Sequence, residues 1–220
     1  MNKTSIYLAS DSTCQTYQKQ DYPQAGWGQF LGLYLKGYNI HNHAIGGRSS
    51  KTFIEEGRLN EILVEIREKD YLFIQMGHND STKEKPARYT EPYQEYKHFL
   101  RQYIEGARAK QAIPLLLTPV TRLHYVKGEF LQDFGDYCNA MKEVAAEEDV
   151  ALIDLMKLSN THLQSIGYQA AKTYFMVAHN GEDHTHFTEK GADQIARIIA
   201  LQFEALLDHP KNKDSLMHNI

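Results

Sequence analysis

The sequence predicts an α/β fold, a three-layer α/β/α sandwich around a five-stranded parallel sheet. Two observations predict it. Short apolar runs alternate along the chain with longer segments whose apolar residues recur at helical spacing, which is the pattern of β-α-β units. The length of 220 residues suits one such domain, and an apolar fraction of 42% supplies a sizeable core. We expect right-handed crossovers between the parallel strands.

The expected strands are short apolar runs bounded by polar or turn-forming residues. They occupy residues 5–9, 38–45, 70–76, 113–118 and 150–155. Amphipathic segments between these runs predict helices. These helices occupy residues 28–36, 51–68, 92–110 and 131–148.

A last helix is expected at residues 189–207, with Thr188 as its N-cap. Its apolar residues share one stripe, which comprises Ile195, Ile198, Ile199, Phe203 and Leu206. Beyond it the pattern is interrupted by Pro210 and polar residues. The sequence therefore predicts one domain over residues 1–207 and a C-terminal tail over residues 208–220.

The composition excludes several classes of partner. The net charge is −4 and Lys and Arg do not cluster, so neither nucleic acid nor an anionic membrane surface is an expected partner. No apolar run is long enough to span a bilayer, and the first residues lack a signal-peptide pattern, so we expect a cytoplasmic protein. Cys14 and Cys138 are expected to be unpaired thiols of a reducing compartment. The sequence leaves the oligomeric state open.

Polar turn residues follow each of the first three predicted strands, at 10–13, 46–49 and 77–80. Because ligands of open α/β sheets bind beyond the carboxyl ends of the strands, we expect these clusters to converge. A fourth cluster, residues 183–186, comes just before the last helix. Together the four clusters predict one site.

The four clusters contain the groups that acyl transfer requires. Ser12 is the predicted nucleophile, His186 its general base, and Asp183 the carboxylate that orients the imidazole. The backbone N–H groups of Ser12 and Gly47 and the side-chain amide of Asn79 are predicted to form the oxyanion hole. Gly47 suits this role because a residue without Cβ lets its backbone approach a substrate closely. The chain order Ser, Asp, His is also that of the α/β-hydrolases, but their G-x-S-x-G elbow is absent.

These blocks resemble those of the SGNH (GDSL-like) hydrolase superfamily, whose members have a flavodoxin-like sheet. The matching residues are Asp11 and Ser12, Gly47, Gly77 to Asp80, and Asp183 with His186. They run from near the start of the chain to near its end, so the resemblance covers essentially one whole domain. One departure is visible, since Ser10 stands where the first motif of the family has glycine.

Further motifs resemble the rhamnogalacturonan acetylesterase branch of that superfamily. They are residues 11–13, 23–28, 47–50 and 183–186. The resemblance implies a serine esterase that removes acetyl groups from acetylated pectic oligosaccharides and needs no metal or organic cofactor. Arg48, His78 and His184 are the predicted substrate contacts.

Several alternatives stay open at this point. Arg48 could hold a galacturonate carboxylate or pair with a nearby acid, and the sequence does not decide whether Arg48 or Arg122 faces the substrate. Trp27 could stack on a sugar, although packing is favoured. His179 lies near the 183–186 cluster, so a metal-dependent hydrolase is a further alternative. Others are an esterase for acetyl-xylan, peptidoglycan or a short acyl lipid, and a non-catalytic carbohydrate-binding protein.

Overall fold

The computed structural model describes residues 3–208, and its core is the expected five-stranded parallel sheet. The strands lie in the order β3-β1-β4-β5-β8, which is the flavodoxin-like order. Their bounds are β1 Ser5–Ser10, β3 Asn39–Asn42, β4 Tyr71–Gln75, β5 Ile113–Leu117 and β8 Ala151–Ile153. The predicted fold class is thus confirmed.

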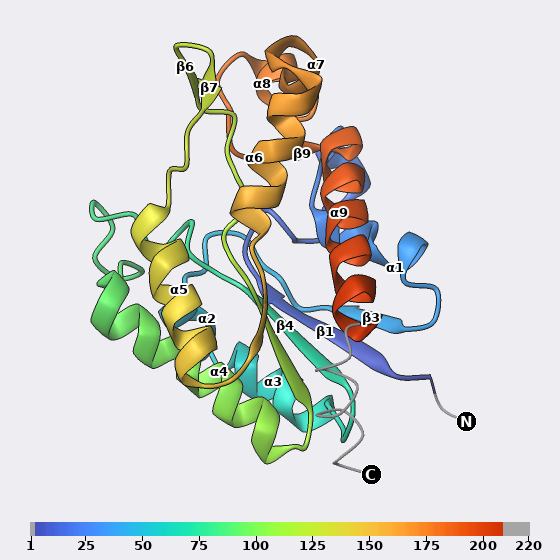
Figure 1. Cartoon of the computed structure of the whole chain (residues 1–220), viewed down its shortest axis with the longest axis vertical. Helices are drawn as coiled ribbons and strands as arrows, with labels where there is room; N and C mark the ends of the chain where they lie inside the picture. Colours follow the sequence, from blue (N-terminus) through green and yellow to red (C-terminus); the bar gives the residue numbers. More distant parts are fainter. Residues whose placement is uncertain (1–2, 209–220) are drawn as a thin grey trace.

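Helices cover both faces of the sheet, as Figure 1 shows. One face packs against α1 (Leu31–Tyr34), α6 (Leu155–Ile166) and α9 (Glu189–Asp208). The other packs against α2 (Ser50–Glu55), α3 (Arg58–Glu65), α4 (Lys97–Ala109) and α5 (Gly135–Glu147). Alternate strand residues serve the two faces: Ile6 and Leu8 belong to the first core, Tyr7 and Ala9 to the second.

The predicted helices differ from the observed ones mainly at their ends and at one break. The helix expected at 51–68 is divided at Gly57, whose φ of +78° interrupts the helical backbone. The segment expected at 28–36 is a 3₁₀ turn, Trp27–Gln29, followed by α1. A π-helical turn, Pro92–Tyr96, precedes α4.

The last helix is close to its prediction. The hydroxyl of Thr188 accepts a hydrogen bond from the backbone N–H of Gly191 (3.3 Å), which confirms Thr188 as the N-cap. Ile195, Ile199 and Phe203 are buried on its inner stripe. Asp208 still belongs to α9, and the rest of the predicted tail, residues 209–220, lies outside the described residues.

Several helices and short strands outside the parallel sheet were not predicted. They are α6, α7 (Tyr168–Lys172), α8 (Val177–Asn180), the hairpin of β6 (Tyr125–Val126) with β7 (Glu129–Phe130), and the antiparallel pair of β2 (Gln24–Ala25) with β9 (Phe187–Thr188). In the β2–β9 pair Ala25 lies opposite Phe187, which immediately follows His186. This pairing ties the predicted base to the segment that follows the predicted nucleophile.

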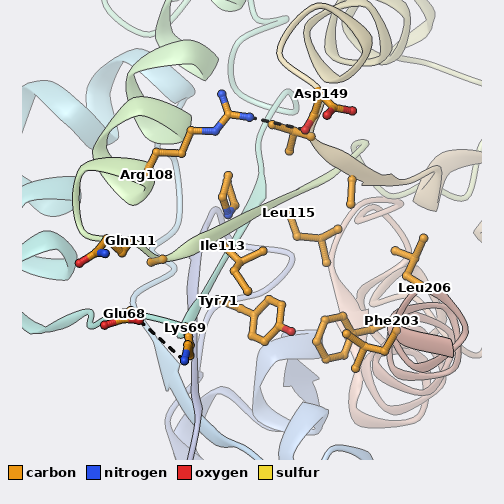
Figure 2. A pocket seen from close by; sticks show the side chains of 15 residues that line it. Glu68, Lys69, Tyr71, Arg108, Gln111, Ile113, Leu115, Asp149, Phe203 and Leu206 are labelled. Carbon is orange, nitrogen blue, oxygen red and sulfur yellow. Dashed lines mark hydrogen bonds and ion pairs between the residues drawn. The ribbon is translucent and has the colours of Figure 1, made fainter. Parts of the chain in front are cut away.

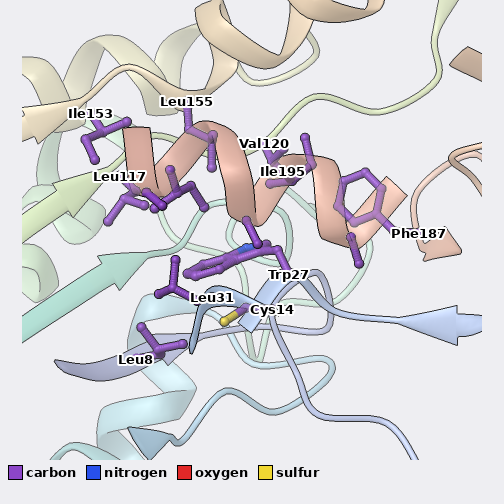
Figure 3. Packing of buried hydrophobic residues seen from close by; sticks show 14 of the residues in the cluster. Leu8, Cys14, Trp27, Leu31, Leu117, Val120, Ile153, Leu155, Phe187 and Ile195 are labelled. Carbon is purple, nitrogen blue, oxygen red and sulfur yellow. The ribbon is translucent and has the colours of Figure 1, made fainter. Parts of the chain in front are cut away.

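Trp27 lies in the core beneath these segments. Figure 3 shows its indole among Leu31, Leu117 and Ile195, beside the Cys14 thiol. Its side chain has no exposed surface, and Nε1 donates a hydrogen bond to Oε1 of Gln75 (3.1 Å). The favoured interpretation of Trp27 as a packing residue is confirmed.

Both cysteines are buried and unpaired. Within residues 3–208 we find no helix that is long and apolar enough to cross a membrane.

Candidate active site

The predicted nucleophile stands on a tight turn after β1. The backbone N–H groups of Cys14 and Gln15 both donate to the carbonyl of Asp11, at 3.2 and 3.1 Å, which closes one helical turn around Ser12. Asp11, Thr13 and Cys14 have no exposed surface, whereas Ser12 is only half-buried. The turn is therefore held from below by the core and presents Ser12 to solvent.

The carboxylate of Asp11 fixes this turn from inside. Its Oδ1 accepts hydrogen bonds from the backbone N–H and the hydroxyl of Thr13, at 2.9 and 2.8 Å. Its Oδ2 lies 3.1 Å from Nδ1 of His78. Burial raises the pKa of Asp11, but the His78 ring and the Thr13 donors outweigh it and hold this pKa below its usual range.

His78 supports the turn and does not reach the substrate side. Its ring is 4% exposed, and Nε2 lies 2.9 Å from the carbonyl oxygen of Val120. Both nitrogens face acceptors, Asp11 and Val120, so both are occupied. The prediction that His78 contacts substrate is corrected, because neither nitrogen is free to bind a ligand.

A continuous hydrogen-bond chain joins the three predicted catalytic side chains. Nε2 of His186 lies 3.0 Å from the hydroxyl of Ser12, and Nδ1 lies 2.7 Å from Oδ2 of Asp183. Because the carboxylate only accepts, Nδ1 carries the hydrogen and Nε2 is left to accept from Ser12. The structure thus brings together three residues that are 171 and 3 positions apart in the sequence, as predicted.

Asp183 is set by the backbone of its own loop. Its Oδ1 accepts from the N–H groups of Thr185 (2.9 Å) and His186 (3.0 Å). Partial burial raises the pKa of Asp183. These donors and the imidazole lower it by a larger amount, so the pKa lies below its usual range. The carboxylate is therefore held ionised where it orients the ring.

The elements that the sequence did not predict hold this loop in place. The N–H of Met176 donates to the carbonyl of His186 (2.9 Å), and that of Val177 donates to Asp183 (2.7 Å). From the segment after β5, the N–H of Leu123 donates to the carbonyl of His184 (2.9 Å). The start of α8 and the chain beyond β5 thus position the loop from two sides.

The three predicted oxyanion donors are available for a ligand. Among the described residues, the backbone N–H groups of Ser12 and Gly47 have no hydrogen-bond acceptor. Gly47 has a φ of +80°, a conformation that glycine adopts without strain. Nδ2 of Asn79 donates to the carbonyl of Arg48 (2.9 Å), which leaves its second N–H for another acceptor.

The turn between β4 and Asn79 needs a glycine at position 77. Its φ is +137°, and a Cβ there would lie 2.4 Å from Cγ of Pro119. A side chain would push the Pro119 ring away and displace the segment that carries Asn79.

The two other predicted substrate contacts have different surroundings. Nε of Arg48 lies 2.9 Å from Oε2 of Glu56, and Nη1 donates to the carbonyl of Gly46 (2.9 Å). Of the two interpretations of Arg48, the structure shows the acid pair, and the substrate contact stays a prediction. His184 is exposed, donates from Nδ1 to Leu123, and lines a pocket of about 440 Å³ beside Asp183.

A second and larger cavity lies elsewhere in the molecule. Figure 2 shows it at the amino ends of the strands, where Tyr71 and Ile113 begin β4 and β5, with the Arg108 side chain at its rim. Its volume is about 750 Å³, and no residue of the predicted site lines it. Size alone therefore does not mark the reactive centre. Across residues 3–208, no three His, Cys, Asp or Glu side chains are grouped as metal ligands.

Sequence reasoning missed Gln75, the last residue of β4. Its Oε1 accepts from Ser10, Thr13 and Trp27. A glutamine in an otherwise apolar strand was the available signal. Arg122, which the sequence left open as a substrate contact, follows β5 and lines the pocket beside Asp183.

The comparisons with known proteins agree with this geometry. A family model described as GDSL-like Lipase/Acylhydrolase matches residues 7–199. The probable rhamnogalacturonan acetylesterase YesY of Bacillus subtilis (strain 168) is 58% identical over 196 residues, which are 89% of this chain and 90% of YesY. The rhamnogalacturonan acetylesterase RhgT of the same organism is 37% identical over 228 residues and is matched over 97% of both chains.

A solved structure is similar as well. The crystal structure of the protein YxiM from Bacillus subtilis matches with a TM-score of 0.81 and 32% identity. The match covers 91% of this chain and 56% of that one.

Proposed function

The chain belongs to the GDSL-like lipase/acylhydrolase family, and from this premise we propose that it is a serine esterase that removes acetyl groups from acetylated rhamnogalacturonan oligosaccharides. The observation that carries the proposal is the chain of hydrogen bonds from Ser12 through His186 to Asp183. The substrate class rests on the named activities of the two relatives from Bacillus subtilis, YesY and RhgT.

In the first step Ser12 attacks the acetyl carbonyl. Nε2 of His186 takes the hydroxyl proton while Asp183 stabilises the imidazolium that forms. The carbonyl oxygen becomes an oxyanion, which accepts from the N–H groups of Ser12 and Gly47 and from the amide of Asn79. The two backbone N–H groups have no acceptor in the described chain, and the Asn79 amide keeps one N–H beside its bond to the Arg48 carbonyl.

Collapse of the tetrahedral intermediate breaks the ester bond. His186 gives its proton to the departing sugar oxygen, and the acetyl group stays on Ser12. In the second step water loses a proton to His186 and attacks the acetyl carbonyl. Acetate leaves, and Ser12 recovers its proton from the ring.

An activity panel tests the proposal. We expect the protein to hydrolyse p-nitrophenyl acetate and to release acetate fastest from acetylated rhamnogalacturonan fragments, compared with acetylated xylo-oligosaccharides and short acyl lipids. Ser12→Ala should abolish turnover without changing the unfolding temperature. Ser165→Ala, an exposed serine on α6, is the matched control and should retain activity.

Three outcomes would contradict the proposal. Activity retained in Ser12→Ala would remove the nucleophile, and absence of labelling of Ser12 by a fluorophosphonate would favour a binding protein. Faster release from xylo-oligosaccharides would replace the pectic substrate. The cytoplasmic location stays a prediction, which fractionation of producing cells tests.

A further inference from the structure

Asp80 is a buried acid that the proposed reaction does not use. It immediately follows Asn79, and its side chain has no exposed surface. Its Oδ1 accepts a hydrogen bond from the hydroxyl of Thr90 (2.9 Å) and another from the hydroxyl of Ser50. Both partners are neutral, whereas a buried carboxylate is ordinarily paired with a cation. The fold thus keeps this acid at a cost, which points to a role other than stability.

The carboxylate of Asp80 reaches the segment that carries the Gly47 donor. The backbone N–H of Ser50 lies 3.1 Å from both carboxylate oxygens of Asp80. Ser50 is the first residue of α2, lies three positions after Gly47, and is itself fully buried. Asp80 therefore accepts both the backbone and the side-chain donor of Ser50, and it holds the start of α2 beside Asn79.

Asn79 contacts the same segment at a second point. Its Nδ2 donates to the carbonyl of Arg48 (2.9 Å), two residues before Ser50. The neighbours Asn79 and Asp80 thus bind one segment at two places. Two contacts fix both the distance and the direction between two segments, whereas one contact would leave them free to pivot. The Asn79 amide and the Gly47 N–H, which are proposed to share the oxyanion, lie on these two segments.

Buried tyrosines anchor the two segments to different helices. The hydroxyl of Tyr103 on α4 donates to the carbonyl of Ser50 (2.9 Å). The hydroxyl of Tyr137 on α5 donates to the carbonyl of Asp80 (2.9 Å). Because each backbone is fixed to its own helix, the bonds between the Asp80 carboxylate and Ser50 join two supports that are separately anchored.

We propose that Asp80 is a positioning residue of the oxyanion hole, whose carboxylate sets the Gly47 N–H and the Asn79 amide at the separation at which both reach one oxygen. The inference deepens the proposed function and rests on it for the roles of Gly47 and Asn79. Burial raises the pKa of Asp80 to about 6, so this carboxylate is ionised at neutral pH. An ionised carboxylate accepts from every donor that faces it, and such bonds are stronger than neutral ones.

The kinetics of Asp80→Asn test this role. Asparagine keeps one acceptor oxygen but replaces the other with an NH₂ group, which cannot accept from Ser50. At a pH above the pKa of Asp80, we expect kcat for p-nitrophenyl acetate to fall by about 10-fold, less than the roughly 10²–10³-fold loss of a whole oxyanion donor. KM should change by less than about twofold, since these donors act on charge that develops in the transition state. The free energy of unfolding should be retained at this pH, because the substitution removes a buried charge whose partners are neutral.

The matched control is Asp70→Asn. Asp70 is also a buried acid with neutral donors, since it accepts from the N–H groups of Ser5 (2.7 Å) and Arg67 (3.0 Å). It directly precedes β4, at the end of that strand opposite to Asn79. Asp70→Asn should therefore leave kcat unchanged, whatever its effect on stability.

The rate at which a fluorophosphonate labels Ser12 gives a second readout. The phosphoryl oxygen of the reagent occupies the oxyanion hole during labelling, and no sugar is involved. We expect the labelling rate of Asp80→Asn to fall by a factor similar to that of kcat. Ser50→Ala should lower both rates by a smaller factor, since the backbone N–H of Ser50 remains. In the double variant the two effects should be less than additive, because they act through one contact.

Four outcomes would overturn the inference and leave the proposed function in place. They are wild-type kcat and labelling rate in Asp80→Asn, a rise in KM at constant kcat, an equal loss of kcat in Asp70→Asn, and, should Asp80→Asn fail to fold, wild-type kcat in Ser50→Ala. A wild-type protein whose Ser12 is not labelled would contradict the proposed function, and the role of Asp80 with it.

Discussion

The reactive centre joins two regions that are held in different ways. The nucleophile turn, residues 10–14, lies on the core, and its Asp11 carboxylate is wholly buried against His78. The acid–base loop, residues 183–186, lies at the surface, where the side chains of Asp183 and His186 are 25% and 30% exposed. Main-chain hydrogen bonds from α8 and the segment after β5 set its position.

This difference separates stability from catalysis. The position of Ser12 depends on the same contacts that stabilise the sheet, so changes beneath it should affect folding and turnover together. The position of His186 depends on local backbone bonds, so changes of its side chain should affect turnover alone.

The largest effect is expected in the acid–base loop. His186→Ala removes the only base within reach of Ser12 in the described chain and should lower kcat by roughly 10⁴–10⁶-fold. The unfolding temperature should stay within a degree or two, because the ring is partly exposed. Steady-state kinetics and thermal unfolding measure both. The control is His179→Ala, which replaces an exposed histidine on α8. A large loss of stability in His186→Ala but not in His179→Ala would contradict the view that the acid–base loop contributes little to stability.

The matching change in the nucleophile turn is Asp11→Asn. It removes the buried charge that contacts His78 and accepts from Thr13, and losing a buried hydrogen bond to a charged group costs about 1.5–3 kcal/mol. We expect the free energy of unfolding in urea to fall by that order, together with kcat. If Asp11→Asn reduced activity and left stability unchanged, the nucleophile turn would not depend on the core contacts that stabilise the sheet.

Asn79 tests the oxyanion hole that is proposed beside these two regions. Asn79→Ala should lower kcat by roughly 10²–10³-fold, the usual effect of losing one oxyanion donor. KM should change little, since the donor acts on charge that develops in the transition state. A rise in KM at constant kcat would remove Asn79 from the oxyanion hole.

A second buried carboxylate, Asp80, makes stability depend on pH in a different way from Asp11. Asp80, like Asp11, has no exposed surface, but its partners Ser50 and Thr90 are neutral, so burial raises its pKa to about 6. The folded protein then binds this proton more tightly than the unfolded chain does. The contribution of Asp80 to stability is therefore present below pH 4 and is lost as the pH rises to about 6, by up to about 2–3 kcal/mol.

Urea unfolding of Asp80→Asn between pH 4 and 7 checks this sign. The variant should lack the fall in stability that the wild-type protein shows in that range. The raised pKa of Asp80 would be contradicted if the wild-type unfolding free energy rose steadily from pH 4 to 6 and Asp80→Asn did not change the slope of that rise.

The smallest effect is expected at the Arg48–Glu56 pair. Both side chains are about a third exposed, and pairs of this kind contribute about 0–1 kcal/mol. Glu56→Gln should therefore change the unfolding free energy by less than that and kcat by less than about twofold. A large loss of activity would instead support Arg48 as a substrate contact.

Much of the fold could be predicted because its signals are local. Four of the five parallel strands are largely apolar runs followed by polar residues, whereas β3 is mostly polar and lies inside the run expected at 38–45. The stripe of α9 repeats at helical spacing. Gly57 divides the expected helix at 51–68 because its backbone takes a positive φ between α2 and α3, and hydrophobic periodicity does not reveal such a break. The short helices α7 and α8 have too few residues to show a period.

The residues of the predicted triad and oxyanion hole could also be proposed from the sequence, because the carboxyl ends of parallel strands meet at one edge of a sheet. The surroundings of His78 and Arg48 could not. A histidine may bind a substrate or a buried acid with equal chemistry, and only burial and partners separate the two.

The sequence by itself determined the layer order, the parallel sheet and the residues able to perform acyl transfer, because these follow from periodicity and from the chemistry of side chains placed after strands. Tertiary structure alone decided which charges neutralise one another. It pairs Arg48 with Glu56, it buries Asp11 against His78, and it leaves Nε of Arg88 and of Arg122 without a hydrogen-bond partner in the described chain. The physical reason is that ion pairing depends on distances of a few ångströms between segments far apart in the chain, and folding sets those distances.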